Sequence, residues 1–416
     1  METPSADELR ALPRPTEARR ELGRTLRSHE DMARRARLES MNAVRPLCSA
    51  NASAFRADGD GFRVTRRGGA TQTERDQALP DSWGTKPASL ETVRDPDDVN
   101  DDGTKAEQDA ARANVEARAE DETAALDAMS QEQRDQYGAV AQSTESDPRS
   151  RESLQTMLLD GDFDGADGAK LLDELHGLTQ DELAEGIDRD ELVSDLVQEL
   201  EDPIAIAQEG KGTCVATSSE ILLAQQQPAE YARLVRGLAS PEGEVTLANG
   251  DTIRRELRTI DDDGSRRAIT QRLLAPALME YGNGADSYSN STDLSYRREH
   301  KPMHGLNGQE AERLLEAMTG QSFRRQDAAA NATDRAALAQ DVLDAANAGQ
   351  TVSTALSWSD GGGHRVLVTG GDDEWVTFIN PWGREDRISR EEFDQRVKSA
   401  AFLEPTLGYS RAATWV

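Results

Sequence analysis

The stretch QEGKGTCVATS, residues 208–218, does most to decide how this chain is interpreted. Two glycines precede Cys214, and the residues that follow it are typical of an amphipathic helix. A cysteine at a helix N-terminus lies at the positive end of the helix dipole, which lowers its pKa and favours the thiolate. The glycines let a substrate backbone approach closely. Gln208 opens the stretch, and its side-chain amide is placed to donate to an oxyanion.

Two later segments supply the partners that a reactive thiol needs. In SWSDGGGHRVLV, residues 357–368, a glycine run leads directly into His364 at the start of an apolar strand. In VTFINPWG, residues 376–383, Asn380 ends a second strand because Pro381 stops further pairing. A tight turn between the two strands brings Asn380 back beside His364. An amide oxygen at that place holds the imidazole in the tautomer that pairs with a thiolate.

The composition limits the function classes. Hydrophobic residues make up 36% of the 416 residues and the formal net charge is -30, which argues against general binding to nucleic acid or anionic membranes. The two cysteines, Cys48 and Cys214, lie in segments of different character, so no disulfide framework is expected. No stretch approaches the ~20 apolar residues of a membrane span. The N-terminus lacks the apolar core of a signal peptide, so we expect a cytoplasmic protein or signal-independent secretion.

Changes in composition along the chain predict three parts. Residues 1–108 are expected to be a charged, largely disordered region with short helices, because the stretch from Cys48 to Gln108 has few large apolar residues. Residues 109–202 carry apolar residues at helical spacing and predict a small helical module. Residues 203–416 are the predicted catalytic domain.

Within the predicted catalytic domain, helices come first and strands later, which indicates an α+β fold. The helices are expected at residues 218–238, 269–281 and 310–318, with a kink at Pro276 in the second. The strands are expected at residues 351–358, 365–369 and 374–379.

Together these segments resemble the papain-like clan of cysteine peptidases, and most closely its calpain-type branch. The resemblance rests on Gln208, the Gly-x-Cys ending at Cys214, His364 and the Asn-Pro-Trp-Gly turn of residues 380–383. It implies a helical half carrying the cysteine, an antiparallel β half carrying the histidine and asparagine, and an active site between them. It also implies a thiolate–imidazolium pair, an oxyanion hole from Gln208 and the Cys214 amide, and shielding of the His–Asn hydrogen bond by Trp382.

Two positions depart from the family pattern. Val215 stands where an aromatic residue usually follows the cysteine, and Arg365 stands where a small residue usually follows the histidine. Both departures bear on the substrate pocket more than on the fold. Nothing in the sequence indicates the calcium dependence of calpains.

The predicted function is therefore hydrolysis of peptide bonds by a Cys214–His364–Asn380 triad, with Gln208 in the oxyanion hole. One alternative is an acyltransferase or deamidase of transglutaminase type. Another is a papain-like binding scaffold without activity, in which Cys214 is a small buried residue and Asn380 caps a turn. The expected partner is a protein or peptide substrate, and no nucleic acid.

No cofactor or resident metal is predicted. His300 and His304 are separated by Pro302, which favours a loop over a metal site. Residues 160–165 resemble the opening of a calcium loop, but Leu171 occupies the place of its final glutamate. A turn between two helices is therefore the preferred interpretation, and calcium binding is left open.

The charged N-terminal region suggests a partner for delivery or regulation. Without a signal peptide, it fits a bacterial effector that a specialised secretion machine delivers. A cytoplasmic enzyme with a regulatory extension fits equally well.

Overall fold

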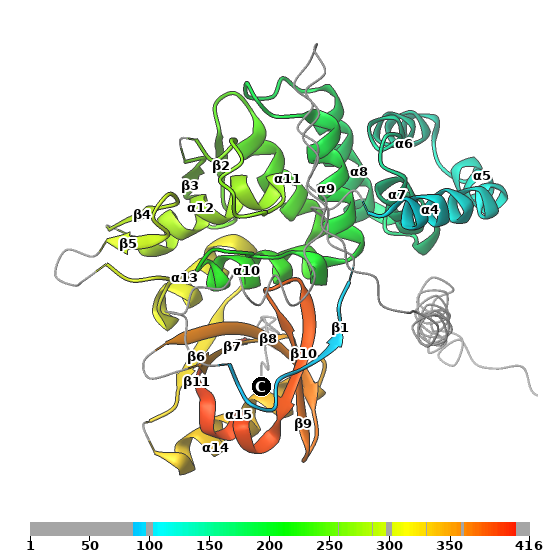
Figure 1. The fold of residues 1–416 in the computed structure, drawn as a ribbon. Coiled ribbons are helices and arrows are strands. Elements are labelled where there is room, and N and C mark those ends of the chain that lie inside the picture. Colours follow the sequence, from blue (N-terminus) through cyan, green and yellow to red (C-terminus); the bar gives the residue numbers. More distant parts are fainter. Residues whose placement is uncertain are drawn as a thin grey trace, which may run out of the picture.

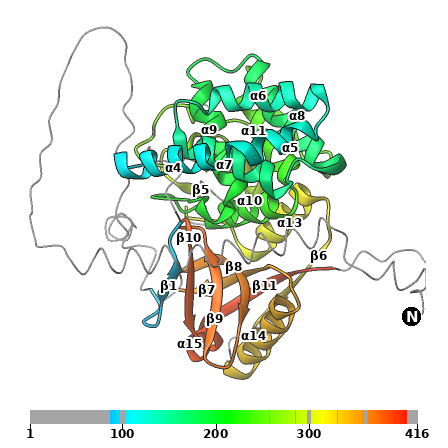
Figure 2. The same cartoon turned by 90° about the vertical axis from the view of Figure 1, so that its right-hand side faces the viewer.

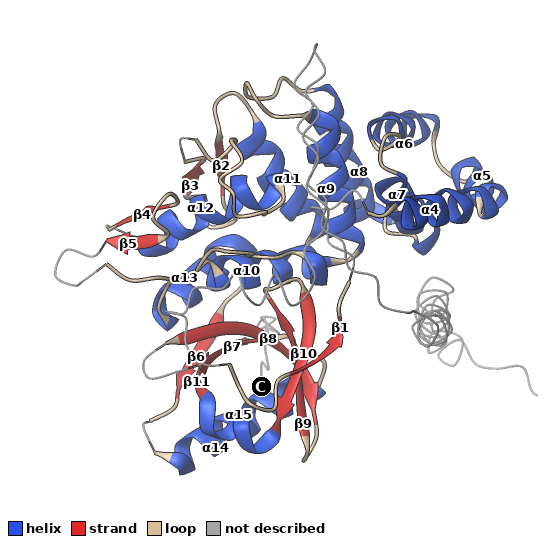
Figure 3. Ribbon diagram, in the orientation of Figure 1, coloured by secondary structure: helices blue, strands red, loops and turns tan. Residues whose placement is uncertain are grey.

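The computed structural model describes residues 86–96, 103–256, 258–284, 286–296, 302–329, 331–358 and 362–404. Cys48 and the short helices predicted near the N-terminus lie outside these residues. The described part is α+β, as the sequence predicts: helices occupy one half, and an antiparallel sheet with its own covering helices occupies the other (Figures 1 and 3). Within it, no helix is long and apolar enough to cross a membrane.

The main sheet has seven antiparallel strands in the order β1-β10-β9-β8-β7-β11-β6. Its strands are β1 (Glu91–Arg94), β6 (Phe323–Asp327), β7 (Val352–Ser357), β8 (Gly363–Gly371), β9 (Trp375–Asn380), β10 (Arg384–Ser389) and β11 (Val397–Leu403). The three strands that the sequence predicts are confirmed as β7, β8 and β9, the centre of this sheet. Two small hairpins, β2 (Glu244–Thr246) with β3 (Thr252–Arg254) and β4 (Ser287–Ser289) with β5 (Leu294–Tyr296), project from the helical half.

Successive side chains of β8 enter different cores because side chains alternate across a strand. Leu367 joins the core shared with the helical half, whereas Val366 and Val368 join the core on the other face. Helices α14 (Ala332–Asn347) and α15 (Arg390–Arg396) cover that second face, and α10 (Cys214–Gln226) lies across the first (Figures 1 and 2). The sheet is therefore buried on both sides near β8.

The remaining helices form the other half of the molecule. They are α4 (Lys105–Ala117), α5 (Ala119–Asp127), α6 (Gln131–Ser143), α7 (Pro148–Asp160), α8 (Gly165–Gln180), α9 (Arg189–Glu201), the 3-10 turn η2 (Pro203–Ala205), α11 (Pro228–Ala239), α12 (Ile269–Asn283) and α13 (Gly308–Thr319). The predicted helices at 269–281 and 310–318 are confirmed as α12, with Pro276 inside it, and α13. The single helix predicted at 218–238 is wrong, because Pro228 begins a new helix after Gln226 ends α10.

Helix α10 is not amphipathic, which corrects a second expectation. Every residue from Cys214 to Ala224 is buried, because the helix lies between the sheet on one side and α11, α12 and α13 on the other. Even Glu220 is fully buried, and it accepts a hydrogen bond from the Gln271 side chain. A helix that is apolar on nearly all sides belongs to the centre of a domain.

Residues 109–202, the predicted helical module, contribute to the same apolar core. Helix α8 packs on α11, and α9 packs on α12, so one apolar core runs from Tyr137 to Leu278 and on to the sheet. The core therefore continues across residue 202 without interruption.

One short part of the predicted disordered region is a strand. Glu91–Arg94 forms β1, which pairs antiparallel with β10 at the edge of the main sheet. Two further contacts hold the segment: Ser89 bonds to the Glu392 carboxylate and Arg94 pairs with Asp202. The disorder expected from composition is therefore wrong for this segment, because its polar groups find charged partners on β10, in α15 and after α9.

The candidate calcium loop is a turn between α7 and α8. Gly161 ends α7 with φ 78, and its amide bonds to the Leu158 carbonyl. Phe163 and Leu171 are both 1% exposed and belong to the core. The residue at the place of the last calcium ligand is thus an apolar core residue.

Candidate active site

His364 and Asn380 meet as the sequence predicts. His364 is the second residue of β8, and its Nε2 lies 2.9 Å from Oδ1 of Asn380, the last residue of β9. Both side chains are buried, with 5% of His364 and none of Asn380 exposed. The β8–β9 hairpin produces this contact because it returns the end of one strand to the start of the other.

Two indole rings enclose the imidazole. The ring centroid of His364 is 4.5 Å from that of Trp358 and 5.0 Å from that of Trp382. Burial lowers the pKa of His364 from 6.5 to about 4, the Asn380 hydrogen bond partly opposes this shift, and the Arg384 charge adds to it. The imidazole is therefore neutral at pH 7. Trp382 is expected from the family resemblance, whereas Trp358, which follows β7 and also packs on the ring, is not.

A buried ion pair holds the far end of the Asn380 amide. Nδ2 of Asn380 donates to Oδ2 of Asp386 at 2.7 Å, and Nε of Arg384 donates to the same oxygen at 2.9 Å. Both charged residues lie on β10, and 3% of Arg384 and 0% of Asp386 is exposed. Sequence reasoning missed this pair, although both residues follow the Asn-Pro-Trp-Gly turn closely.

Cys214 begins α10, as predicted, and its thiol faces β8. Burial raises the pKa of Cys214, and the main-chain amides of Arg365 and Val215 oppose this rise. Burial is the larger effect, since only 9% of the residue is exposed, and the net pKa is raised. Burial thus favours the neutral thiol and the neutral imidazole over the thiolate–imidazolium pair that the family resemblance implies.

Gln208 lies beside the turn that follows Asn380. Its main-chain amide donates to the Pro381 carbonyl at 2.7 Å, and Ala207 forms a β-bridge with Trp382. Gly383 makes this close approach feasible: its φ is 72, and a Cβ there would lie 3.1 Å from the Ala207 Cβ. The Gln208 side chain is 1% exposed, and its Nε2 donates to the carbonyl of Lys211. An amide nitrogen carries two hydrogens, and this bond uses one of them.

The nucleophile loop, residues 208–214, has a second anchor that the sequence did not reveal. The Gly212 amide donates to Oδ2 of Asp293 at 2.7 Å, and Nδ1 of His304 lies 3.0 Å from the same oxygen. Asp293 precedes β5 and adopts φ 55, a left-handed conformation that aspartate accepts more readily than most residues. His304 lies in a loop, as predicted, whereas His300 lies outside the described residues.

This anchor changes the role expected for Gly212. A Cβ on that residue would lie 3.1 Å from Oδ2 of Asp293 and 3.2 Å from the Cβ of His304. The glycine therefore makes room for the protein's own side chains, not for a substrate backbone. The neighbouring Lys211 is held in the same way, because its Nζ donates to the Asn290 carbonyl at 2.8 Å.

Three separate contacts connect the four predicted site residues to the start of β8 and the turn after β9. Asn380 bonds to His364, the Gln208 backbone bonds to Pro381, and the Cys214 thiol lies against the amide of Arg365, the residue after His364.

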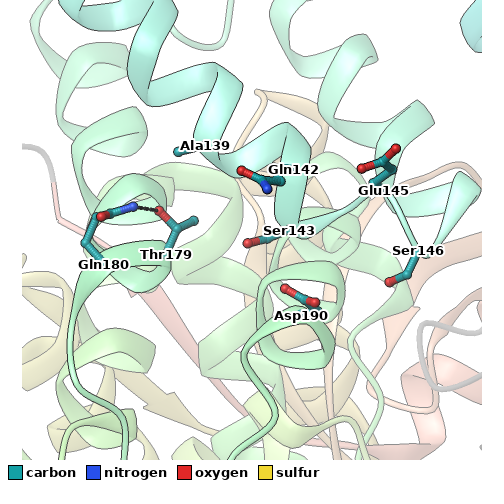
Figure 4. A pocket seen from close by; sticks show the side chains of 8 residues that line it. All are labelled: Ala139, Gln142, Ser143, Glu145, Ser146, Thr179, Gln180 and Asp190. Carbon is teal, nitrogen blue, oxygen red and sulfur yellow. Dashed lines mark hydrogen bonds between the residues drawn. The ribbon is translucent and has the colours of Figure 1, made fainter.

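A surface hollow of about 600 Å³ lies elsewhere, between α6, α8 and α9 (Figure 4). Its lining is polar: Ala139, Gln142, Ser143, Glu145, Ser146, Thr179, Gln180 and Asp190. None of these residues belongs to the predicted site. The hollow gathers carboxylates, hydroxyls and amides.

Among the described residues, no group of three or more His, Cys, Asp or Glu side chains is placed to hold a metal ion. No protein-family model matches the chain, and a search of curated proteins finds no match either. The function must therefore be argued from the geometry of the site.

Proposed function

We propose that the chain is a cysteine peptidase with a papain-like catalytic fold, in which Cys214 is the nucleophile and His364 its base. The observation that carries the proposal is the buried hydrogen bond between His364 and Asn380 at the strand position where the thiol of Cys214 meets the Arg365 amide. A nucleophile, a base and a residue that orients the base are the parts that covalent acyl transfer requires.

In the proposed reaction, substrate binding brings a carbonyl carbon to the sulfur. The thiol proton moves to Nδ1 of His364 as the C–S bond forms, and the carbonyl oxygen becomes an oxyanion. The main-chain amide of Cys214 and the second Nε2 hydrogen of Gln208 donate to this oxyanion. The imidazolium then gives its proton to the amine as the C–N bond breaks, and water, deprotonated by His364, hydrolyses the thioester.

The neutral resting state fits this sequence of events. A neutral imidazole can accept the thiol proton at the moment of attack, whereas an imidazolium could not.

The test uses the full chain and unfolded casein as a general peptide substrate, with fragments identified by mass spectrometry. We expect cleavage by the native protein, and loss of cleavage in Cys214→Ala and in His364→Ala, both still folded by circular dichroism. Cleavage that survives in Cys214→Ala would overturn the proposal.

The burial of the thiol also favours a second candidate, a papain-like scaffold that binds a partner without catalysis. It predicts that iodoacetamide alkylates Cys214 no faster than an ordinary cysteine and that casein stays intact. Alkylation and cleavage together separate the two candidates.

A further inference from the structure

The Asn380 amide is held at both ends by groups of opposite kind. Its Nδ2 faces Oδ2 of Asp386 at 2.7 Å, and its Oδ1 faces Nε2 of His364 at 2.9 Å. A carboxylate paired with a guanidinium can only accept hydrogen bonds, so the amide must turn its NH₂ group to Asp386. The amide oxygen is then the only atom left to face the imidazole.

We propose that Asp386 is a positioning residue that selects the tautomer of His364. An amide oxygen can only accept, so Nε2 of His364 must carry the proton in the Nε2–H···Oδ1 hydrogen bond. In the neutral imidazole the lone pair is then on Nδ1. Asp386 thus acts through Asn380: it fixes the direction of the amide, and the amide fixes which imidazole nitrogen is the base.

Asp386 is itself held by groups from two strands. Arg384 on β10 donates through Nε to Oδ2 at 2.9 Å, and Oγ1 of Thr92 on β1 donates to Oδ1 at 2.9 Å. The carboxylate is fully buried, so loss of these donors would leave it without compensation. Strand β1 therefore helps to support the site, although Thr92 lies 294 positions before Asp386 in the sequence.

The tautomer assignment stands apart from any activity, whereas its kinetic consequence rests on the proposed function. If His364 is the base, the thiol proton can move only to a nitrogen that has a lone pair. The Nε2–H tautomer supplies it at Nδ1, and the opposite tautomer would block the transfer. Asp386 is therefore expected to affect the rate of acyl transfer without touching the substrate.

The first experiment reads the tautomer directly. The full chain is labelled with ¹⁵N-histidine, and its imidazole nitrogens are observed by NMR at pH 7, with His364→Gln used to assign the signal. We expect a proton on Nε2 and none on Nδ1. A proton on Nδ1 in the native protein would overturn the proposal.

The second experiment removes the constraint. Asp386→Asn can donate as well as accept, so Asn380 is free to turn over, and we expect a mixture of tautomers. Because this change leaves the Arg384 charge buried without its anion, the double variant Asp386→Asn/Arg384→Gln is tested beside it. Asp195→Asn is the control: this aspartate is 1% exposed and accepts the Ile269 amide at 3.1 Å in the helical half.

The kinetic readout is the burst of p-nitrophenolate released when p-nitrophenyl acetate acetylates Cys214. We expect the burst to be slower by the factor by which the Nε2–H fraction falls, about 2-fold for an equal mixture, in Asp386→Asn and in the double variant, and unchanged in Asp195→Asn. Variants that keep a pure Nε2–H tautomer and a native burst rate would overturn the role of Asp386. A native protein without any burst would contradict the proposed function, while the NMR result would still decide the tautomer.

Discussion

The two sides of the site are assembled by different kinds of contact. On the imidazole side, formed by His364, Asn380 and Asp386, the bonded residues are separated by 16 and 6 positions in the sequence. On the thiol side, formed by residues 208–214 with Asp293 and His304, the Gly212 amide bonds to a carboxylate 81 positions away. The first side is made within consecutive strands of one sheet. The second depends on a hairpin from the helical half reaching the nucleophile loop.

This difference explains what could be predicted from the sequence. The spacing of His364 and Asn380 around a glycine-rich turn predicts a hairpin, and a hairpin places its strand ends together by geometry alone. The contact of Asp293 with Gly212 follows from no periodicity or motif, because the β4–β5 hairpin and α12 must pack before it exists. The burial of α10 was missed for a related reason: the strand that covers it, β8, is formed by residues that come more than a hundred positions later.

The direction of the pKa shift of Cys214 could not be predicted from the sequence either. A cysteine at a helix N-terminus predicts a lowered pKa. In the folded protein the same helix is enclosed, and burial raises the pKa of Cys214 more than the amides of Val215 and Arg365 lower it. Only the structure shows which of the two opposing effects is larger.

The largest effect is expected on the imidazole side. Asn380→Ala removes the acceptor for His364 and leaves the Asp386–Arg384 pair facing a cavity. We expect the p-nitrophenyl acetate burst to slow by roughly 10²-fold, and the free energy of unfolding to fall by about 1–3 kcal/mol. Urea unfolding and stopped-flow absorbance measure the two quantities. A burst at the native rate would show that Asn380 does not orient the base.

A pH titration of stability probes the same side. Because the pKa of His364 in the folded protein is lowered to about 4, the unfolded chain binds this proton more readily, and stability falls as the pH drops from 6.5 to 4. The contribution present above pH 6.5 is up to about 3 kcal/mol, and it is lost below pH 4. His364→Gln should flatten this part of the curve obtained by urea unfolding. An equal acid loss in the variant would contradict the burial argument.

Glu220 on α10 should affect the pH dependence of stability in the opposite direction. Burial raises its pKa to about 8, so the folded protein binds this proton more readily than the unfolded chain does. Its contribution is fully present below pH 4.5 and is lost as the pH rises through 8. In Glu220→Gln the alkaline loss of stability should therefore be smaller by a few kcal/mol at most. An equal loss of stability at alkaline pH in the native protein and in Glu220→Gln would contradict the raised pKa of Glu220.

The smallest effect is expected on the thiol side. Asp293→Ala removes the acceptor of the Gly212 amide, and it also removes a negative charge that raises the pKa of Cys214. We expect the p-nitrophenyl acetate burst to slow by about 10-fold, because the loop that carries the oxyanion donors is less well fixed. Alkylation by iodoacetamide, which needs no oxyanion hole, should stay equal or become faster.

Circular dichroism must show a native fold in Asp293→Ala, because general loss of structure would also slow the burst and expose the buried thiol to faster alkylation. Asp372→Ala is the matched control, because Asp372 accepts the Glu374 and Trp375 amides in the β8–β9 turn, at the far end of β8 from His364. Both rates should be native in that variant.

The central claim is that the Cys214 thiol and the His364 imidazole act on one carbonyl group. The most direct measurement is intact-protein mass spectrometry during the p-nitrophenyl acetate burst, in the native chain and in His364→Ala. The account predicts one acetyl group on Cys214 within the native burst, and formation of the same adduct roughly 10²-fold more slowly without the imidazole. Equal acetylation rates in the two proteins, or no acetyl group on Cys214, would contradict it.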